Sequence, residues 1–202
     1  MPGGELKLAP VAGKFELRFK SPSVTTGYLG NPEATARAFD EEGFYCTGDA
    51  GRLADPDDPN KGLVFDGRIA EDFKLATGTW VSVGPLRVAL LAAADGLIAE
   101  ALILAPNRPY AAALVWLDPV IAKSLDAATL RSRIHAALAR LDAGQSASSL
   151  RIERLTVAAS PPSMEAGEIN EKAYLVQAVA RDRRAAEIDA LYAEPAGDNT
   201  HP

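Results

Sequence analysis

The stretch LIAEALILAPNRPYAAALVWL, residues 97–117, contains two apolar runs on either side of a turn. Residues 97–104 and 110–117 are each bounded by turn residues, and apolar runs of this kind are typical of strands that are covered on both faces. The two runs therefore predict a pair of buried strands at the centre of a domain.

Outward from this pair, the sequence predicts helices and further strands on both sides. Residues 85–94 and 127–142 have the periodicity of amphipathic helices. A short strand at 81–83, a strand at 150–158 and a long helix at 169–192 complete the pattern. The order is strand, helix, strand, strand, helix, strand, helix, which is typical of a compact α/β domain.

The first third of the chain reads as β-rich, with strands expected at 5–8, 14–20, 44–46, 50–53 and 63–65. Residues 32–39 predict a short helix with Asn31 as its N-cap. Phe15, Leu17 and Phe19 alternate along one predicted strand, so they share one face of the sheet. A small β-rich subdomain is therefore expected before the α/β domain.

Composition argues against several classes of function. The chain has 202 residues, of which 48% are apolar and 24% charged, and its net charge of −6 argues against a broad nucleic-acid-binding face. The longest apolar stretch, 88–106, is broken by Asp95 and Glu100, so no membrane span is expected. One cysteine excludes an internal disulfide, and with only two histidines no metal site is expected. A soluble cytoplasmic protein is the simplest interpretation.

Four short motifs follow one another along the chain: GYLGNPEAT at 27–35, YCTGD at 45–49, GRIAEDFK at 67–74 and PPSMEAGEI at 161–169. In this order and at these separations they resemble the adenylate-forming superfamily, which includes acyl-CoA synthetases, luciferases and peptide-synthetase adenylation domains. The continuation of the third motif through GTWV at 78–81 resembles feruloyl-CoA synthase-like enzymes more closely. The resemblance extends over nearly the whole chain.

The resemblance implies a division of the chain into four parts. Residues 1–67 would form the β-rich end of a large adenylation domain, and residues 73–194 a small α/β C-terminal lid domain. Residues 68–72 would be the hinge, with Ala70 at the pivot where the family usually has Asp or Lys. Alanine imposes little constraint on the backbone, so rotation remains possible, and an ordinary linker is the alternative. Residues 195–202 are expected to be a flexible tail.

Asp49 and Arg68 are the candidate ligands of a nucleotide. Taken alone, Asp49 is a turn residue and Arg68 a surface arginine at a strand end. A carboxylate can, however, accept hydrogen bonds from two vicinal hydroxyls, and a guanidinium suits sugar hydroxyls and phosphate oxygens. The resemblance implies that both residues hold the ribose of ATP or AMP from neighbouring strands. The role of Tyr45 in the same motif stays open.

Lys74, Gly78, Thr79 and Trp80 are the candidate residues for coenzyme A. The resemblance implies that Lys74 faces the active site in the thioester-forming orientation, with a solvated lysine as the alternative. It also implies that residues 76–80 form part of the CoA tunnel wall. Trp80 either stacks on the pantetheine arm or fills the core, and we favour the core.

The last motif departs from the family. Most members end it with Gly-Lys, whose lysine reaches the substrate carboxylate and the α-phosphate during adenylation, whereas here Glu168 follows Gly167. A carboxylate cannot stabilise negative charge that develops on a phosphate. If residues 169–192 are helical, Lys172 lies one turn after Glu168 and either supplies the missing cation or pairs with Glu168. A basic cluster further along either contacts the 3′-phosphate of CoA or forms a solvated helix face, and we favour the solvated face: Arg181, Arg183 and Arg184.

Two parts that an ATP-using ligase needs are missing from the sequence, a Ser/Thr/Gly-rich phosphate loop and a pocket for the acid. We therefore expect the C-terminal part of an AMP-forming ligase for an aromatic acid such as ferulate, with ATP and CoA as cosubstrates. It would be a fragment, a truncated reading frame or one subunit of a split enzyme, and inactive alone. Mg²⁺ is expected in the full enzyme but not on this chain.

Two other functions stay open. A non-catalytic module would dock on a partner chain or on itself through Phe15, Leu17 and Phe19, which we expect to be exposed without a large-domain neighbour. An adenylation domain that serves a carrier protein instead of CoA is the third possibility. No nucleic-acid or membrane partner is expected.

Overall fold

The computed structural model describes residues 3–11, 13–104, 106–143, 151–193 and 200–201. The chain forms two compact units, Met1–Ala70 and Glu71–Pro202, which are called unit 1 and unit 2 and are described separately. Their assignment to the end of a large domain, a hinge and a lid stays a prediction. None of the helices in the described part of the chain combines the length and hydrophobicity that a membrane crossing requires.

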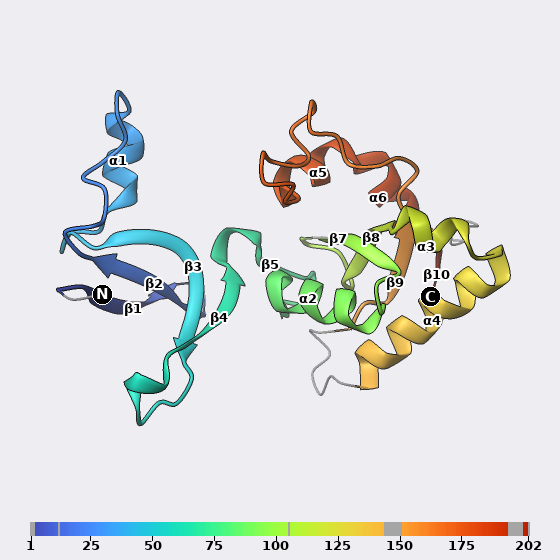
Figure 1. The fold of residues 1–202 in the computed structure, drawn as a ribbon, viewed down its shortest axis with the longest axis horizontal. Coiled ribbons are helices and arrows are strands. Elements are labelled where there is room, and N and C mark those ends of the chain that lie inside the picture. The colour runs from blue at the N-terminus through green and yellow to red at the C-terminus, as the bar shows by residue number, and fades with distance from the viewer. Residues whose placement is uncertain (1–2, 12, 105, 144–150, 194–199, 202) are drawn as a thin grey trace. The chain divides into compact units, whose positions relative to one another are not determined.

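Unit 1 is a four-stranded antiparallel sheet in the order β1-β2-β3-β4, with one helix between β2 and β3 (Figure 1). The helix has the predicted start, because the Asn31 side chain accepts a hydrogen bond from the backbone N–H of Ala34 and Pro32 follows it. The strands expected at 44–46 and 50–53 are a single bulged strand, β3. The elements of unit 1 are β1 (Glu5–Val11), β2 (Lys14–Lys20), α1 (Pro32–Ala38), β3 (Tyr45–Leu53), η1 (Pro59–Lys61) and β4 (Leu63–Arg68), with η2 (Ile69–Glu71) at its end.

The sequence predicted that Phe15, Leu17 and Phe19 would all be exposed, and for Leu17 this prediction is wrong. Phe15 is 48% exposed, whereas Leu17 is only 8% exposed. Leu17 packs over Gly51 of β3, where a Cβ atom would lie 2.9 Å from its terminal methyl groups. The missing side chain at Gly51 thus creates the space that Leu17 fills, which alternation along one strand could not reveal.

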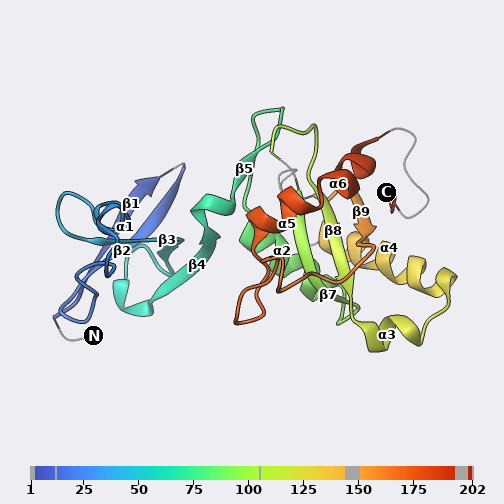
Figure 2. The same ribbon diagram turned by 90° about the horizontal axis from the view of Figure 1, so that it is seen from above.

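Unit 2 is built on the sheet β10-β9-β8-β7, in which β7 and β8 are antiparallel and β8 and β9 are parallel (Figure 2). The apolar runs at 97–104 and 110–117 form β7 and β8, and the predicted α/β class is confirmed. A separate two-stranded ribbon, β5-β6, precedes α2. The elements of unit 2 are β5 (Phe73–Lys74), β6 (Trp80–Val81), α2 (Val83–Ala93), β7 (Ile98–Leu104), β8 (Ala112–Leu117), α3 (Pro119–Lys123), α4 (Ala127–Ala143), β9 (Arg154–Val157), α5 (Gln177–Arg183), α6 (Ala185–Tyr192) and β10 (Thr200–His201).

Strands β7 and β8 are covered on both faces, which explains why their sequences are apolar without alternation. One face packs against α2 and α4 through Leu86, Leu90 and Ile134. The other packs against α5 through Ala180 and against α6 through Ile188 and Leu191. Figures 1 and 2 show the two helix pairs on opposite sides of this sheet. Each fully buried Leu or Ile side chain contributes about 1.5–3 kcal/mol to the driving force for folding.

The single helix predicted over 169–192 is wrong. Residues 169–175 form a tight turn in which Ala173 has φ of +60°, a conformation that an α-helix excludes. Helix α5 begins only at Gln177, and the chain bends again at Arg184 before α6. The helix propensity of these residues is therefore overridden by tertiary contacts, namely the Ile169–Leu175 pairing and the bonds between Arg184 and Glu168. Of the predicted tail, 195–199 and 202 lie outside the described residues, and Thr200–His201 pair with β9.

A chain of residues 71–202 should fold without unit 1, because both apolar clusters of unit 2 are made of its own residues. We expect cooperative thermal unfolding and a near-ultraviolet circular dichroism band from Trp116, which is 6% exposed. Replacing the 42% exposed Trp80 by Phe should leave that band in place. Helical signal without a near-ultraviolet band would contradict the prediction, since secondary structure without fixed packing marks a molten globule.

Candidate functional site

Asp49 and Arg68 lie opposite each other on neighbouring strands of unit 1. Asp49 on β3 is the register partner of Arg68, the last residue of β4, and Arg68 Nε lies 2.9 Å from Asp49 Oδ1. The arginine side chain is 59% exposed and the aspartate side chain 32%, so this ion pair contributes little to stability. The structure thus brings together the two residues that the sequence singled out as nucleotide ligands.

The Asp49 carboxylate retains hydrogen-bonding capacity. Its Oδ1 atom is buried, and within the described residues it receives no well-aligned hydrogen bond, although Arg68 lies at ion-pair distance. The Asp49 side chain as a whole is 32% exposed, so the carboxylate group is open to a ligand from its solvent side while Oδ1 faces Arg68. A carboxylate beside a guanidinium matches a vicinal diol, whose hydroxyls donate to the former and accept from the latter.

The turn that leads into Asp49 has a defined shape. Gly48 has φ of +71°, in the left-handed region that side chains rarely adopt, which explains the glycine of the second motif. The Thr47 hydroxyl donates to the Leu17 carbonyl oxygen at 2.6 Å and accepts from the Asp49 backbone N–H at 3.0 Å. These bonds tie the turn to β2.

Tyr45 connects the same site to the first motif. Its hydroxyl lies 3.0 Å from that of Tyr28, and its ring packs edge-on against Phe39 with the centroids 5.6 Å apart. The hydrogen bond with Tyr28 raises the pKa of Tyr45, so the phenol stays neutral at physiological pH. Tyr45 therefore joins the loop before α1 to the strand that carries Asp49.

Ala70, the predicted pivot, lies in the 3-10 turn Ile69–Glu71, where it is exposed. Two residues further on, the Asp72 side chain accepts a hydrogen bond from the backbone N–H of Val83 at 2.9 Å. This bond fixes the start of α2 to the beginning of unit 2. The hinge role of Ala70 stays a prediction.

Lys74 and Trp80 face each other across the β5-β6 ribbon of unit 2. Lys74 Nζ lies 5.1 Å from the centroid of the Trp80 ring, which is a cation–π distance. Because Trp80 is 42% exposed, the core position favoured from the sequence is wrong. Side chains alternate along a strand, so Val81, which is fully buried, takes the inward position instead.

Gly78 and Thr79 form the open end of this ribbon. Gly78 has φ of +84°, and no atom lies within 4 Å of the position that a Cβ would occupy. The Thr77 hydroxyl donates to the Thr79 hydroxyl at 3.0 Å, and the Thr79 carbonyl oxygen accepts from the backbone N–H of Leu75 at 2.9 Å. The turn therefore presents backbone and hydroxyl groups beside a cation and an aromatic ring.

Glu168 is a buried anchor of unit 2. It is 2% exposed, and both carboxylate oxygens accept hydrogen bonds from Arg184, at 2.7 Å from Nε and 3.0 Å from Nη2. The backbone N–H of Ser163 adds a third bond at 2.8 Å. The hydrogen bonds from Arg184 lower the pKa of Glu168, and the same contact raises the pKa of Arg184. The pair is therefore fully charged at neutral pH.

Lys172 lies at the tip of a tight hairpin and not on a helix. Ile169 and Leu175 pair at its base, and the Asn170 side chain accepts from the Lys172 backbone N–H at 3.0 Å. The Lys172 side chain is exposed, and no described residue forms an ion pair with its ammonium group. The alternative in which Lys172 pairs with Glu168 is wrong, because that carboxylate is buried and already bound.

Arg184 is the residue that sequence reasoning misplaced on a solvated face. It is 7% exposed, donates to Ser160 Oγ at 2.9 Å and lies 5.6 Å from the centroid of the Trp116 ring, in addition to its bonds with Glu168. One feature of the sequence could have indicated that Arg184 is buried. It follows Ala180 by four residues, so in a helix it would lie on the same face as that small apolar residue.

Metal-binding groups do not gather in the part of the chain that the structure describes: it contains no cluster of three or more His, Cys, Asp or Glu side chains suited to an ion. Burial raises the pKa of the half-buried Cys46 thiol, which keeps it protonated at neutral pH.

Residues 73–196 match the family described as AMP-binding enzyme C-terminal domain. The chain belongs to this family. The match with AMP-binding enzymes covers the Lys74–Trp80 ribbon, strands β7, β8 and β9, the buried Glu168–Arg184 pair and the Lys172 hairpin.

Several known AMP-binding enzymes and related proteins resemble the chain over different lengths. The carboxylic acid reductase of Segniliparus rugosus is 27% identical over 182 residues, which are 89% of this chain and 15% of that protein. Human long-chain-fatty-acid–CoA ligase 1 is 36% identical over 78 residues, 39% of this chain and 11% of the ligase. The A-PCP didomain of the Segniliparus reductase, solved in complex with AMP, aligns with 95% of this chain and 28% of its own at a TM-score of 0.75 and 23% identity. The 202 residues thus span a small part of each relative.

Replacing Glu168 by Gln should destabilise unit 2 of this AMP-binding enzyme domain by about 3–5 kcal/mol at neutral pH, since Arg184 loses its buried partner. Folding lowers the pKa of Glu168 below its ordinary value of 4.5. Its contribution is therefore complete above that value and is lost as the pH falls through the folded-state pKa. Urea unfolding at neutral and acidic pH should show the difference between wild type and variant shrinking on acidification. The exposed Glu165→Gln variant is the control, and a pH-independent difference would contradict the assignment.

Proposed function

We propose that this chain supplies the C-terminal part of an acid–thiol ligase that activates an aromatic carboxylic acid, such as ferulate, with ATP and transfers the acyl group to coenzyme A. The observation that carries the proposal is the pairing of Asp49 with Arg68 on neighbouring strands, where both side chains are partly exposed to solvent. Membership of unit 2 in the AMP-binding enzyme family supports it. The choice of ferulate rests on the resemblance of residues 67–75 and 78–81.

The proposed reaction has two steps. A carboxylate oxygen of the acid attacks the α-phosphorus of ATP, and the bond to the leaving pyrophosphate breaks, which leaves an acyl-AMP. The thiolate of coenzyme A then attacks the acyl carbonyl carbon, and AMP leaves with the electrons of the carbon–oxygen bond. Both steps need a nucleotide held in place and a cation near developing negative charge.

Asp49 and Arg68 act on the nucleotide in both steps of this proposal. The Asp49 carboxylate accepts hydrogen bonds from the ribose hydroxyls, and Arg68 donates to the same sugar. Because the ribose is bound before and after each step, these contacts contribute uniform binding and do not favour one transition state. Any Mg²⁺ would enter with the nucleotide, and no residue of this chain is assigned to hold it.

Lys172 is the proposed cation of the first step. Its exposure at a hairpin tip, with no ion-pair partner among the described residues, leaves its ammonium group available for a phosphate oxygen. The buried Glu168–Arg184 pair supports the base of that hairpin. A glutamate in the usual lysine position is then compatible with adenylation, because the cation comes from four residues later.

Lys74 and Trp80 are the proposed contacts of the second step. Their cation–π pair presents a positive charge and an apolar ring surface side by side, next to the open turn at Gly78 and Thr79. Coenzyme A has phosphates that the Lys74 ammonium group could bind and a pantetheine arm that could lie against the Trp80 ring. Ala70, between the two units, is the proposed pivot that exchanges Lys172 for Lys74.

A carrier-protein thiol is the second candidate acceptor. A relative that matches 89% of this chain is a carboxylic acid reductase, and one solved structure that aligns with 95% of it is an A-PCP didomain, whereas the CoA ligase matches 39%. The attack on the acyl-AMP is the same for either thiol. Replacing free coenzyme A by a thiol-bearing carrier protein in a thioester assay separates the two acceptors.

The proposal also requires a large domain, in the same polypeptide or on a partner chain, to supply the phosphate loop and the acid pocket. Exposed apolar side chains of unit 1, including Phe15 at 48% and Phe65 at 61%, are suited to cover such a partner or a second copy. A docking module without catalysis is the alternative. It predicts stable complexes whose formation does not depend on nucleotide.

The 202-residue chain alone should not turn over ATP, because its sequence contains neither a phosphate loop nor an acid pocket. Pyrophosphate release should be measured with the purified chain and a panel of aromatic acids. The same assay with an added large domain is the positive control. Sustained, acid-dependent release by the chain alone at an ordinary enzymatic rate would refute the proposal that it is only part of a ligase.

In an enzyme completed with a large domain, Lys172→Ala should lower the rate of acyl-AMP formation by at least ~10²-fold, the loss typical of one preorganised charge donor. Thioester formation from supplied acyl-AMP should survive, because the lysine acts only in the first step. Single-turnover measurements of each half-reaction test this, with the exposed Lys123→Ala variant as control. An unchanged rate of adenylation would make Lys172 a surface residue and require another cation.

A further inference from the structure

Glu16 is a buried carboxylate beside the candidate nucleotide site. It lies on β2 and is 6% exposed, although it belongs to a strand whose outer residues face solvent. Its Oε1 accepts from the backbone N–H of Gly48 at 2.9 Å, and its Oε2 accepts from Arg18 Nε at 2.8 Å. Each carboxylate oxygen thus has a donor, as a buried charge requires.

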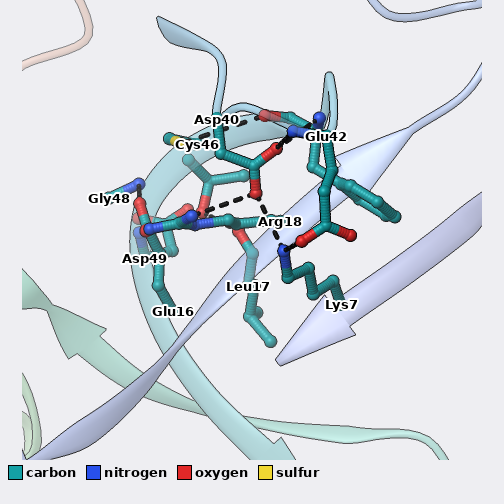
Figure 3. A network of polar contacts seen from close by, with 11 residues as sticks. Lys7, Glu16, Leu17, Arg18, Asp40, Glu42, Cys46, Gly48 and Asp49 are labelled. Carbon is teal, nitrogen blue, oxygen red and sulfur yellow. Dashed lines mark hydrogen bonds and ion pairs between the residues drawn. The ribbon is translucent and has the colours of Figure 1, made fainter. Parts of the chain in front are cut away.

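Arg18 carries this contact on to the end of α1. Its Nη1 donates to Asp40 Oδ2 at 3.0 Å, and Lys7 Nζ donates to the same oxygen at 3.1 Å. Asp40 Oδ1 accepts from the backbone N–H of Phe44 at 2.9 Å, which lowers the pKa of Asp40 together with the two cations. Figure 3 shows Asp40 between Arg18 and Lys7, with Glu16 next to Gly48 and Asp49.

Two independent bonds from β2 therefore hold the turn before Asp49. Glu16 binds the N–H of Gly48, and the Leu17 carbonyl oxygen binds the hydroxyl of Thr47. Gly48 is in a left-handed conformation with an intrinsically wide choice of dihedral angles, so its N–H direction is set by its acceptor. The direction in which the backbone enters Asp49 depends on the dihedral angles of Gly48, and therefore on the bond between its N–H and Glu16.

We propose that Glu16 is a positioning residue for nucleotide binding, which fixes the Thr47–Gly48–Asp49 turn so that the Asp49 carboxylate meets the ribose hydroxyls beside Arg68. This proposal rests on the ribose-binding role of Asp49 proposed above. Arg18 acts one step further out, because it orients Glu16 and connects it to Asp40.

Stability alone does not account for this arrangement. Buried ion pairs are often replaced by packed apolar side chains without loss of stability, since desolvation offsets their attraction. A carboxylate at position 16 does, however, give the Gly48 N–H an acceptor in a defined place. The geometry of Glu16 is therefore explained by the residue next to Gly48, because Asp49 carries the ligand carboxylate.

The test uses the intact 202-residue chain and AMP as the probe. Backbone amide signals of Gly48, Asp49 and Arg68 are followed by NMR during titration with AMP to millimolar concentrations. Four proteins are compared: wild type, Glu16→Gln, Asp49→Ala and Glu42→Gln. Glu42 is the matched control, because it belongs to the same network through Lys7 but is 66% exposed and does not contact the turn. Hydrogen exchange is measured on the same samples.

Asp49→Ala should abolish the AMP response. Glu16→Gln leaves a neutral, weaker acceptor for the Gly48 N–H and an amide nitrogen that cannot accept from Arg18, so it should raise the dissociation constant about tenfold. Glu42→Gln should bind as the wild type does. In Glu16→Gln, hydrogen exchange should accelerate at Gly48 and Asp49 while the amides that pair β1 with β2 keep their protection. A purely structural role would instead accelerate exchange across the whole sheet.

The outcomes separate the two proposals. If Asp49→Ala loses AMP but Glu16→Gln binds it with wild-type affinity, the positioning role is wrong and the ribose role stands. If wild type gives no response at these amides, or Asp49→Ala responds as wild type does, the ribose role fails and the positioning role with it. Uniform acceleration of exchange in Glu16→Gln also overturns the positioning role.

A second variant covers the case in which Glu16→Gln does not fold. Arg18→Lys keeps the positive charge. A lysine lacks the planar guanidinium with which Arg18 binds Glu16 and Asp40 at the same time. It should weaken AMP binding a few-fold and accelerate exchange at Gly48 alone. Wild-type affinity in a folded Arg18→Lys protein, with unchanged exchange at Gly48, would refute the network's part in positioning.

Discussion

A buried carboxylate must have a donor for each of its oxygens, and this constraint organises both candidate sites. In unit 1 Glu16 is satisfied by Gly48 and Arg18, and in unit 2 Glu168 is satisfied by Arg184 and Ser163. Leaving either charge unpaired would cost several kcal/mol, so the backbone adopts the turns that satisfy them. Through these bonds Glu16 helps to hold the turn before Asp49, and Glu168 helps to hold the hairpin before α5.

The residues with proposed chemistry are exposed, and the residues that hold them are not. Asp49, Arg68, Lys74 and Lys172 all face solvent at least in part, whereas Glu16, Glu168 and Arg184 are each less than 10% exposed. A side chain that must meet a ligand cannot spend its hydrogen bonds on its own unit. This division explains how a glutamate occupies the place of the family's usual lysine. It anchors the hairpin from inside while Lys172 projects from the tip.

Membership in the AMP-binding enzyme family concerns unit 2, and unit 1 adds the structure around Asp49 and Arg68. In unit 2, strands β7 and β8 are covered on both faces by closely packed side chains. Unit 1 contributes the Asp49–Arg68 ion pair, in which Asp49 lies on the bulged strand β3 and Arg68 ends β4. The proposed ligase would use both units, because the sugar contact would come from unit 1 and the cation from Lys172 of unit 2.

The α/β class, the strands β7 and β8, the capped start of α1 and the Asp49–Arg68 pair could all be predicted, because they depend on local periodicity, capping and motif spacing. By itself the sequence also determined the family that its motifs resemble. Only the tertiary structure decided that Trp80 is exposed, that Leu17 is covered over Gly51 and that residues 169–192 are not one helix. The physical reason is that two of these outcomes depend on a partner far along the chain. Gly51 is 34 residues from Leu17, and Arg184 is 16 residues from Glu168. The exposure of Trp80 depends on which side of the short β5-β6 ribbon faces the core. No local pattern records which distant group will satisfy a buried charge or fill a space.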